Sequence, residues 1–125
     1  ICPHAGSLAT CDTVKRAYFI NYPMYAIKAE GNESVIPTSY SALKLDKENV
    51  ICETVKEAES TLDTIVRLYE TKNVRSVATL EIGFEASKCY LCDLLENELE
   101  ELEIKDGKVA VDIKGFEIVT LKFKK

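Results

Sequence analysis

The sequence predicts an all-β fold, an antiparallel β-sandwich of about eight short strands that follows an irregular N-terminal segment. Apolar and polar residues alternate with a period of two in several short runs after Thr38, as in half-buried strands. Turn residues such as Asp106-Gly107 separate these runs, and a length of 125 residues suits one core. We therefore expect a single domain over residues 1–125, with an irregular segment at 1–37 and a strand-rich core at 38–125.

The N-terminal segment allows two interpretations. Residues 13–20 can form a short helix with Asp12 as its N-cap, and Pro23 would then end it. The same residues can instead form an extended segment that packs its aromatic side chains on a sheet. Residues 31–37 are predicted to be a turn or loop.

The first half of the core is predicted to hold four strands, which cover residues 43–45, 49–55, 62–69 and 75–82. In the second of them, the alternation places Val50, Cys52 and Thr54 on one side. In the third, it places Arg67 and Tyr69 opposite the apolar Val66 and Leu68.

Apolar residues in the stretch from Cys89 to Glu103 fit both a helical and a strand period. Leucines recur at helical spacing among glutamates, which favours an amphipathic helix over about residues 93–102. A tight turn at Asp106-Gly107 needs its first strand to start near Glu100, and this leaves little room for a helix. We therefore predict a strand to Leu95, a connection, and a second strand.

The last part of the chain carries the strongest local signal. Asp106-Gly107 separates residues 102–105 from 108–114, and both residues suit the positive φ angles of a type I′ hairpin turn. A final strand at 116–124 is apolar on both faces in part, which is typical of a central or bulged strand.

Composition narrows the class of partner. The net charge is −5, from 16 basic and 21 acidic residues, whereas nucleic acids and anionic membranes attract clustered Lys and Arg. No apolar run approaches the roughly 20 residues that cross a bilayer. We expect neither nucleic acid nor membrane as a partner. Because the chain starts at Ile1 and not at Met, we expect a processed or excised piece of a longer protein.

The cysteines predict reduced thiols in a cytoplasmic protein. They are odd in number and irregular in spacing, which makes a poor disulfide framework. Cys89 and Cys92 have the spacing of a metal-binding or redox pair, but a zinc ribbon needs a second pair. On a strand, positions three apart point to opposite faces, so we predict buried structural thiols. The five are Cys2, Cys11, Cys52, Cys89 and Cys92.

A self-sufficient active site does not emerge. Cys2, His4 and Cys11 can be read as three metal ligands, but we favour side chains that pack or face solvent. His4 is the only histidine, so no serine or cysteine triad can be assembled with a second one. The acidic run at 96–103 is interpreted as a solvated face. We assign no catalytic residue and no metal ligand.

Four blocks of sequence resemble the C-terminal region of family 38 α-mannosidases, in the same order and at similar spacing. One departure is Gly115, where the family more often has Pro. The blocks are Pro3-His4-Ala5-Gly6 followed by Tyr18 and Asn21-Tyr22-Pro23, then Ile65-Val66-Arg67-Leu68-Tyr69-Glu70, Tyr90-Leu91-Cys92-Asp93-Leu94-Leu95-Glu96 and Gly115-Phe116-Glu117-Ile118-Val119-Thr120-Leu121.

The resemblance implies the non-catalytic C-terminal β-domain of a retaining glycosidase that hydrolyses terminal α-mannosyl residues. In that family a separate catalytic domain holds the zinc ion and the nucleophile, so no cofactor is expected in this chain. The resemblance also makes Arg67 and Tyr69 candidates for the substrate rim or an interdomain contact, with Glu70 as an orienting partner. The plainer interpretation of these residues is a cross-strand salt bridge.

Two other classes of protein are compatible with the sequence. A free-standing carbohydrate-binding β-sandwich would dock sugars on exposed aromatics, but the sequence has no Trp, and Tyr18, Tyr22 and Tyr25 lie in the irregular segment. A thiol or metal protein would bind zinc tightly. As a separated piece, the chain is also expected to self-associate through an exposed apolar patch.

Overall fold

The structure, a computed structural model, describes residues 3–7, 10–28 and 39–125. Its contacts divide the chain into two compact units, Ile1–Tyr40 and Ser41–Lys125. The border lies close to residue 38, where the sequence pattern changes. The single domain over residues 1–125 stays a prediction.

The first unit contains a short helix, α1 (Thr13–Asn21). This confirms the helical interpretation and extends it by one residue. Asp12 occupies the N-cap position, but its side chain makes no capping hydrogen bond among the described residues. Because none of the helix residues is buried and a nine-residue helix is marginal in water, α1 has little local stability. The loop predicted at 31–37 lies outside the described residues.

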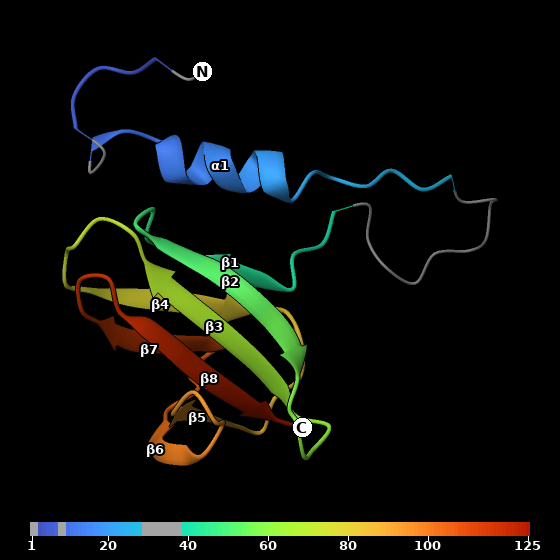
Figure 1. Cartoon of the computed structure of the whole chain (residues 1–125). Helices are drawn as coiled ribbons and strands as arrows, with labels where there is room; N and C mark the ends of the chain where they lie inside the picture. The colour runs from blue at the N-terminus through green and yellow to red at the C-terminus, as the bar shows by residue number, and fades with distance from the viewer. Residues whose placement is uncertain (1–2, 8–9, 29–38) are drawn as a thin grey trace. The chain divides into compact units, whose positions relative to one another are not determined.

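The described part of the second unit forms eight strands in two antiparallel sheets (Figure 1), which confirms the predicted β-sandwich. One sheet has three strands in the order β1-β4-β7, and the other has five in the order β2-β3-β8-β5-β6. The strands are β1 (Leu43–Leu45), β2 (Val50–Glu57), β3 (Thr64–Glu70), β4 (Ser76–Ile82), β5 (Lys88–Cys92), β6 (Glu98–Leu102), β7 (Lys108–Ile113) and β8 (Ile118–Lys124).

The core lies between the two sheets and follows the predicted alternation. In β7 every second residue is buried, and β4 shows the same period. Strand β8 lies between β3 and β5 and is buried on both faces over most of its length, which confirms the prediction of a central strand. The buried apolar side chains that meet in the core include Val66, Leu68, Ala78, Leu80, Ile82, Cys89, Val109, Val111, Ile113, Leu121 and Phe123.

A β-bulge in β2 overturns one predicted face. Cys52 pairs with Leu68 and Thr54 pairs with Arg67, so Glu53 is an extra residue without a partner in β3. An extra residue reverses the alternation. Thr54 therefore lies on the outer face with Arg67, not on the inner face with Val50 and Cys52 as predicted.

Two strands joined by a connection form here in place of a helix, as predicted, but the first ends at Cys92 and not at Leu95, because residues 93–97 form a turn. The hairpin at Asp106-Gly107 is also smaller than predicted. Asp106 and Gly107 have φ angles of 50° and 70°, as a type I′ turn requires. Lys105 and Lys108 form an isolated bridge with two hydrogen bonds of 2.9 Å. No longer ladder follows in this part of the structure, because β6 pairs with β5 and β7 pairs with β4. The turn therefore carries the chain from one sheet to the other.

Candidate functional site on the outer face of the five-stranded sheet

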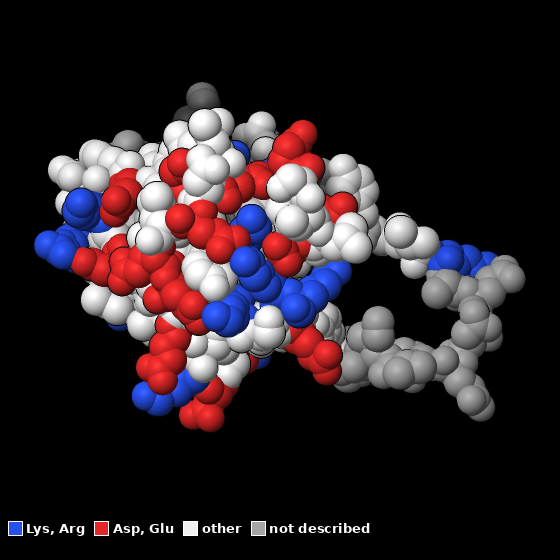
Figure 2. Space-filling view, turned by 90° about the horizontal axis from the view of Figure 1, so that it is seen from below, with Lys and Arg blue, Asp and Glu red and all other residues white. Residues whose placement is uncertain are grey.

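Charged side chains of both signs lie close together on the surface of the protein. Figure 2 shows a group of Lys and Arg atoms beside a broad band of Asp and Glu atoms. The basic side chains on the outer face of the five-stranded sheet include Lys56, Lys122 and Lys124, and all three form ion pairs with glutamates. The face is therefore mixed in charge.

Arg67 and Tyr69 lie on this outer face, as predicted. Both side chains are half-buried, whereas Val66 and Leu68 between and beside them are fully buried in the core. The sequence pattern of β3 thus places each of these four residues on its correct face.

Tyr69 is the centre of an apolar row that crosses three strands. It pairs with Ile51 of β2 on one side and with Ile118 of β8 on the other. Ile118 is 56% exposed, and the other two side chains are half-buried. The outer face of a sandwich that meets only water is normally polar. This row is an apolar strip on that face, next to Arg67.

Arg67 connects the sheet to the loop between β5 and β6. Its Nη2 donates a hydrogen bond to the carbonyl oxygen of Leu94 at 3.2 Å. Its Nε is buried and has no hydrogen-bond partner among the described residues. Its cross-strand neighbours are Thr54 and Thr120, so the register supplies no carboxylate for the cross-strand salt bridge considered above.

The loop at 93–97 is held together by the Asp93 carboxylate. Asp93 Oδ1 accepts hydrogen bonds from the backbone N–H groups of Leu95 (2.8 Å) and Asn97 (2.9 Å), and Oδ2 accepts one from Asn97 Nδ2 at 2.9 Å. The hydrogen bonds from Asn97, together with that from Leu95, hold the pKa of Asp93 below its ordinary value. The loop therefore has a defined shape.

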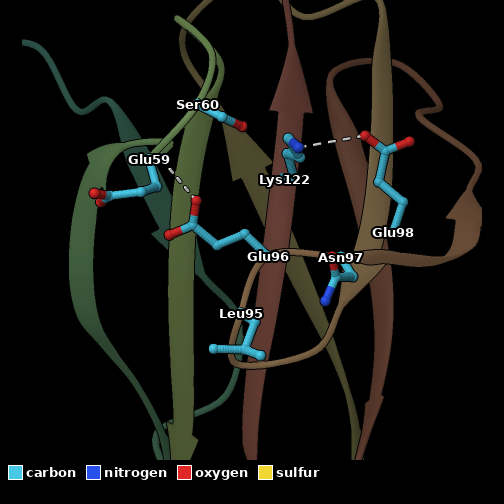
Figure 3. A pocket seen from close by; sticks show the side chains of 7 residues that line it. All are labelled: Glu59, Ser60, Leu95, Glu96, Asn97, Glu98 and Lys122. Carbon is cyan, nitrogen blue, oxygen red and sulfur yellow. Dashed lines mark hydrogen bonds and ion pairs between the residues drawn. The ribbon is translucent and has the colours of Figure 1, made fainter.

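Glu96 fixes this loop to the other edge of the sheet. Its carboxylate lies 2.6 Å from Lys56 Nζ. It also accepts a hydrogen bond from the backbone N–H of Glu59 at 2.8 Å, which is drawn in Figure 3. These bonds, helped by the nearby charge of Arg67, lower the pKa of Glu96. Only 9% of its side chain is exposed, so Glu96 departs from the solvated face predicted for residues 96–103.

A shallow polar hollow lies beside the loop (Figure 3). Its volume is about 430 Å³. Lys122 is almost buried at its wall and lies 3.4 Å from a carboxylate oxygen of Glu98. Because carboxylates and one ammonium group already pair across it, the hollow is charged and largely satisfied. The residues that line it are Glu59, Ser60, Leu95, Glu96, Asn97, Glu98 and Lys122.

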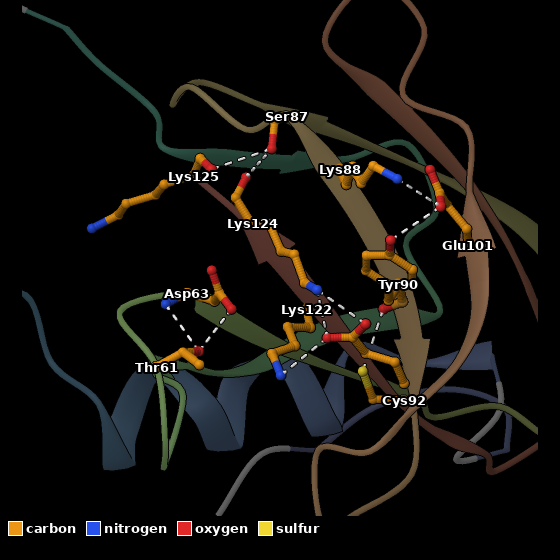
Figure 4. A network of polar contacts seen from close by, with 11 residues as sticks. Thr61, Asp63, Ser87, Lys88, Tyr90, Cys92, Glu101, Lys122, Lys124 and Lys125 are labelled. Atoms are coloured by element: carbon orange, nitrogen blue, oxygen red, sulfur yellow. Dashed lines mark hydrogen bonds and ion pairs between the residues drawn. The ribbon is translucent and has the colours of Figure 1, made fainter.

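A network of polar contacts continues along β5, β6 and β8 (Figure 4). Glu101 accepts hydrogen bonds from the Tyr90 hydroxyl at 3.0 Å and from Lys88 Nζ at 3.2 Å. Lys124 Nζ lies 2.9 Å from Glu98 and 4.7 Å from the centre of the Tyr90 ring. Hydrogen bonds from lysine lower the pKa of Glu98 and of Glu101. Exposed pairs of this kind contribute little stability each.

Glu70 has a structural role that differs from the expected one. Its side chain is fully buried on the inner face of β3, opposite Arg67, and accepts hydrogen bonds from Asn49 Nδ2 (2.9 Å) and the backbone N–H groups of Lys72 and Phe116 (both 2.8 Å). Burial acts to raise the pKa of Glu70, but these hydrogen bonds outweigh it and the pKa is lowered. Glu70 therefore joins three connecting segments, before β2, after β3 and before β8, and does not orient Arg67.

The cysteine pair on β5 consists of buried thiols, as predicted. Cys89 pairs with Phe123 and Cys92 with Thr120, three positions apart on opposite faces. Both are free thiols, as is Cys52. Burial raises the pKa of Cys89 to about 12 and also raises that of Cys92.

Metal ligands do not gather in the described residues. Within residues 3–7, 10–28 and 39–125, no three His, Cys, Asp or Glu side chains lie close enough to hold an ion. Cys2, one of the three candidate ligands near the N-terminus, lies outside the described residues. None of the described helices is long and apolar enough to cross a membrane.

Sequence reasoning missed the contribution of the 93–97 loop to this face. Asp93 and Asn97 flank the loop, and Asp and Asn are common turn residues, so the turn had a local signal. The Lys56–Glu96 pair and the Arg67–Leu94 contact had none, because they join segments far apart in the chain.

The two packed antiparallel sheets define a β-sandwich domain. The family model described as "Glycosyl hydrolases family 38 C-terminal beta sandwich domain" matches residues 49–121. The chain belongs to this family, which confirms the resemblance found in the sequence. The matched region runs from the residue before β2 into β8 and includes the whole 93–97 loop.

Curated relatives agree with this assignment. The chain is 30% identical over 124 residues to human Alpha-mannosidase 2C1 and 28% identical over 124 residues to the mouse protein of the same name. It is 30% identical over 132 residues to Alpha-mannosidase G of Dictyostelium discoideum. These matches cover 95% to 98% of this chain, which spans only 12% of the length of each relative.

Proposed function

We propose that this chain is the non-catalytic C-terminal domain of an α-mannosidase, a retaining glycosidase that hydrolyses terminal α-mannosyl residues. We further propose that it packs on the zinc-binding catalytic domain of the same polypeptide and helps to shape its active site. Family membership supports the first part. The relatives are about eight times longer than this chain, so a protein of their kind has most of its length elsewhere.

The observation that carries the packing role is the composition of the outer face at Arg67. A half-buried Arg and a half-buried Tyr lie there next to two isoleucines, Ile51 and Ile118. Tyr and Arg are enriched at the centres of protein interfaces, where apolar area and charged hydrogen bonding are combined. This combination suits a contact with another domain, or with the rim of a sugar site, better than contact with water alone.

The test is to place Tyr69→Ser and Arg67→Ala separately in the full-length α-mannosidase that contains this domain. We expect each to raise KM or lower kcat for an α-mannoside while the enzyme stays folded at the assay temperature. Val77→Ser is the control, because Val77 is an exposed apolar side chain on the other sheet. Kinetics that equal those of the control in both variants would refute a role at the active site.

Two further parts of the proposal concern location and association. We propose that the protein is cytoplasmic, and the free thiols of Cys52, Cys89 and Cys92 support this. Cell fractionation tests it directly. We also propose that the separated chain self-associates through the apolar row of Ile51, Tyr69 and Ile118, and light scattering that reports a strict monomer at every concentration would contradict this.

A further inference from the structure

The geometry points to Leu94 and Leu95 as the anchor that docks this domain on the catalytic domain of the same polypeptide. We infer that the 93–97 loop inserts these two side chains into an apolar pocket on that domain. The inference rests on the proposed function and deepens it, since it names the contact surface and the chemistry of its partner.

The two leucines are exposed where a polar pair would be expected. Leu94 is 63% exposed and Leu95 is 82% exposed, and they are consecutive residues of a surface loop. Loops of this kind are usually polar. Single exposed apolar residues are common, whereas adjacent ones on a fixed loop mark a place of interaction.

The loop is fixed from inside and from both sides. Asp93 closes it with three hydrogen bonds, Arg67 holds the Leu94 carbonyl oxygen, and Glu96 binds Lys56 and the Glu59 N–H. Figure 3 shows Leu95 on this loop beside Glu96 and Asn97. A loop that is already ordered loses little conformational entropy on binding. The structure therefore presents the leucines in a position ready for contact.

Charge around the leucines is largely compensated. Residues 93–103, which carry the leucines, contain six acidic residues and no Lys or Arg. The Asp93 carboxylate accepts hydrogen bonds within the loop, and Glu96 and Glu98 are paired with lysines from other strands. Glu100 is opposite Leu91 in the ladder of β5 and β6, so it lies on the core-facing side and away from the outer face. An apolar partner surface therefore fits the leucines.

The match to much longer relatives supports a partner within the same polypeptide. The leucines lie inside the region that matches the family, residues 49–121. The chain spans 12% of the length of its relatives, so the nearest large surface in such a protein is its own remaining domains. We therefore propose that the leucines contact the catalytic domain. The experiment distinguishes this partner from a second copy of the protein.

The experiment uses the full-length α-mannosidase with the double substitution Leu94→Ser/Leu95→Ser. Val77→Ser is the control, because it removes an exposed apolar side chain from the other sheet. We expect the double variant to increase amide hydrogen exchange at least tenfold in one apolar segment of the catalytic domain. Limited proteolysis should release the β-domain faster, and the control should match the wild type in both measurements.

The outcomes separate this inference from the proposed function. Unchanged exchange and proteolysis in the double variant would overturn the leucine anchor, whereas the kinetics of the Tyr69→Ser variant test the packing role independently. A double variant that changes only the oligomeric state, measured by light scattering, would assign the leucines to a second copy and would also overturn the anchor. Because both leucines are exposed, the substitutions leave the sandwich core intact, and a melting curve verifies this.

Discussion

The Arg67 guanidinium donates a hydrogen bond to the Leu94 carbonyl oxygen at 3.2 Å, across 27 residues of sequence. This single contact joins β3, near the middle of the five-stranded sheet, to the loop that presents two exposed leucines. It gives Arg67 a positioning role that is separate from any contact it makes with a sugar or with another domain.

The first prediction follows from this contact. Arg67→Ala should increase the hydrogen exchange of the Leu95 and Asn97 amides severalfold and cost about 1 kcal/mol of unfolding free energy. Arg67→Lys retains the charge but loses the fork of donors, so it should restore the stability only in part. Exchange in the loop that equals the wild-type rate in both variants would contradict the positioning role.

A second prediction concerns the buried carboxylate of Glu70. Glu70→Gln keeps the volume but replaces one acceptor oxygen by a donor that faces the N–H groups of Lys72 or Phe116. Leaving buried donors unpaired costs about 1–3 kcal/mol each, so we expect a loss of about 2–3 kcal/mol in urea unfolding. Glu81→Gln, which removes an exposed pair with Lys44, is the control and should cost under about 0.5 kcal/mol. Equal losses would refute the special role of Glu70.

Acid should destabilise the sandwich through the carboxyl groups with lowered pKa values. The pKa of Glu70 is lowered from an ordinary value of 4.5, and that of Asp93 from 3.8. A lowered pKa means that the unfolded chain binds protons first as the pH falls. The stabilisation is therefore complete above about pH 5 and is lost as the pH falls through these ordinary values and below.

The measurement is the unfolding free energy from pH 7 down to pH 3, in the wild type and in Glu70→Gln. The variant lacks the titrating group at position 70, so its curve should fall less steeply with acid. Parallel curves would show that Glu70 titrates with the same pKa in the folded and unfolded chains.

Thiol reactivity should follow burial. The pKa of Cys89 is about 12, so roughly one molecule in 10,000 carries its reactive thiolate at pH 8. Cys11 is half-buried, and hydrogen bonds with Thr13 lower its pKa. We expect Cys11 to react with an alkylating reagent much faster than Cys89 or Cys92, as peptide mass mapping would show. In denaturant all five cysteines should react, and rapid labelling of native Cys89 would contradict its burial.

Sugar binding separates the domain proposed here from a free-standing carbohydrate-binding module. The 125-residue chain should show no saturable binding when it is titrated with α-mannosides up to millimolar concentrations, because the proposed interface needs the catalytic domain. Calorimetry or NMR shift changes measure this. Saturable binding that Tyr69→Ser abolishes would favour the binding module instead.

Local sequence signals explain which parts of this structure were predictable. The alternation in β4 and β7 predicted which side chains face the core, because strands have a period of two. The apolar residues on both faces of β8 predicted that this strand lies inside its sheet. The bulge at Glu53 gave no local sign, and it moved Thr54 to the other face. The outer-face site depended on contacts between distant segments, so the sequence placed Arg67 and Tyr69 correctly but assigned Glu70 a partner that it does not contact.

The turn at Asp106-Gly107, which carries the chain from one sheet to the other, affects the order in which this domain can fold. Strands β5 and β6 are neighbours in sequence and can pair early, whereas β7 must find β4 and β8 must find β3, each across a long stretch of chain. Pairing of distant segments carries a loop-closure cost before any contact compensates it, and it slows folding. Ribosomal synthesis delivers β7 and β8 after all their partners, so both sheets stay incomplete, with the β3 and β4 edges uncovered, until the final strands arrive.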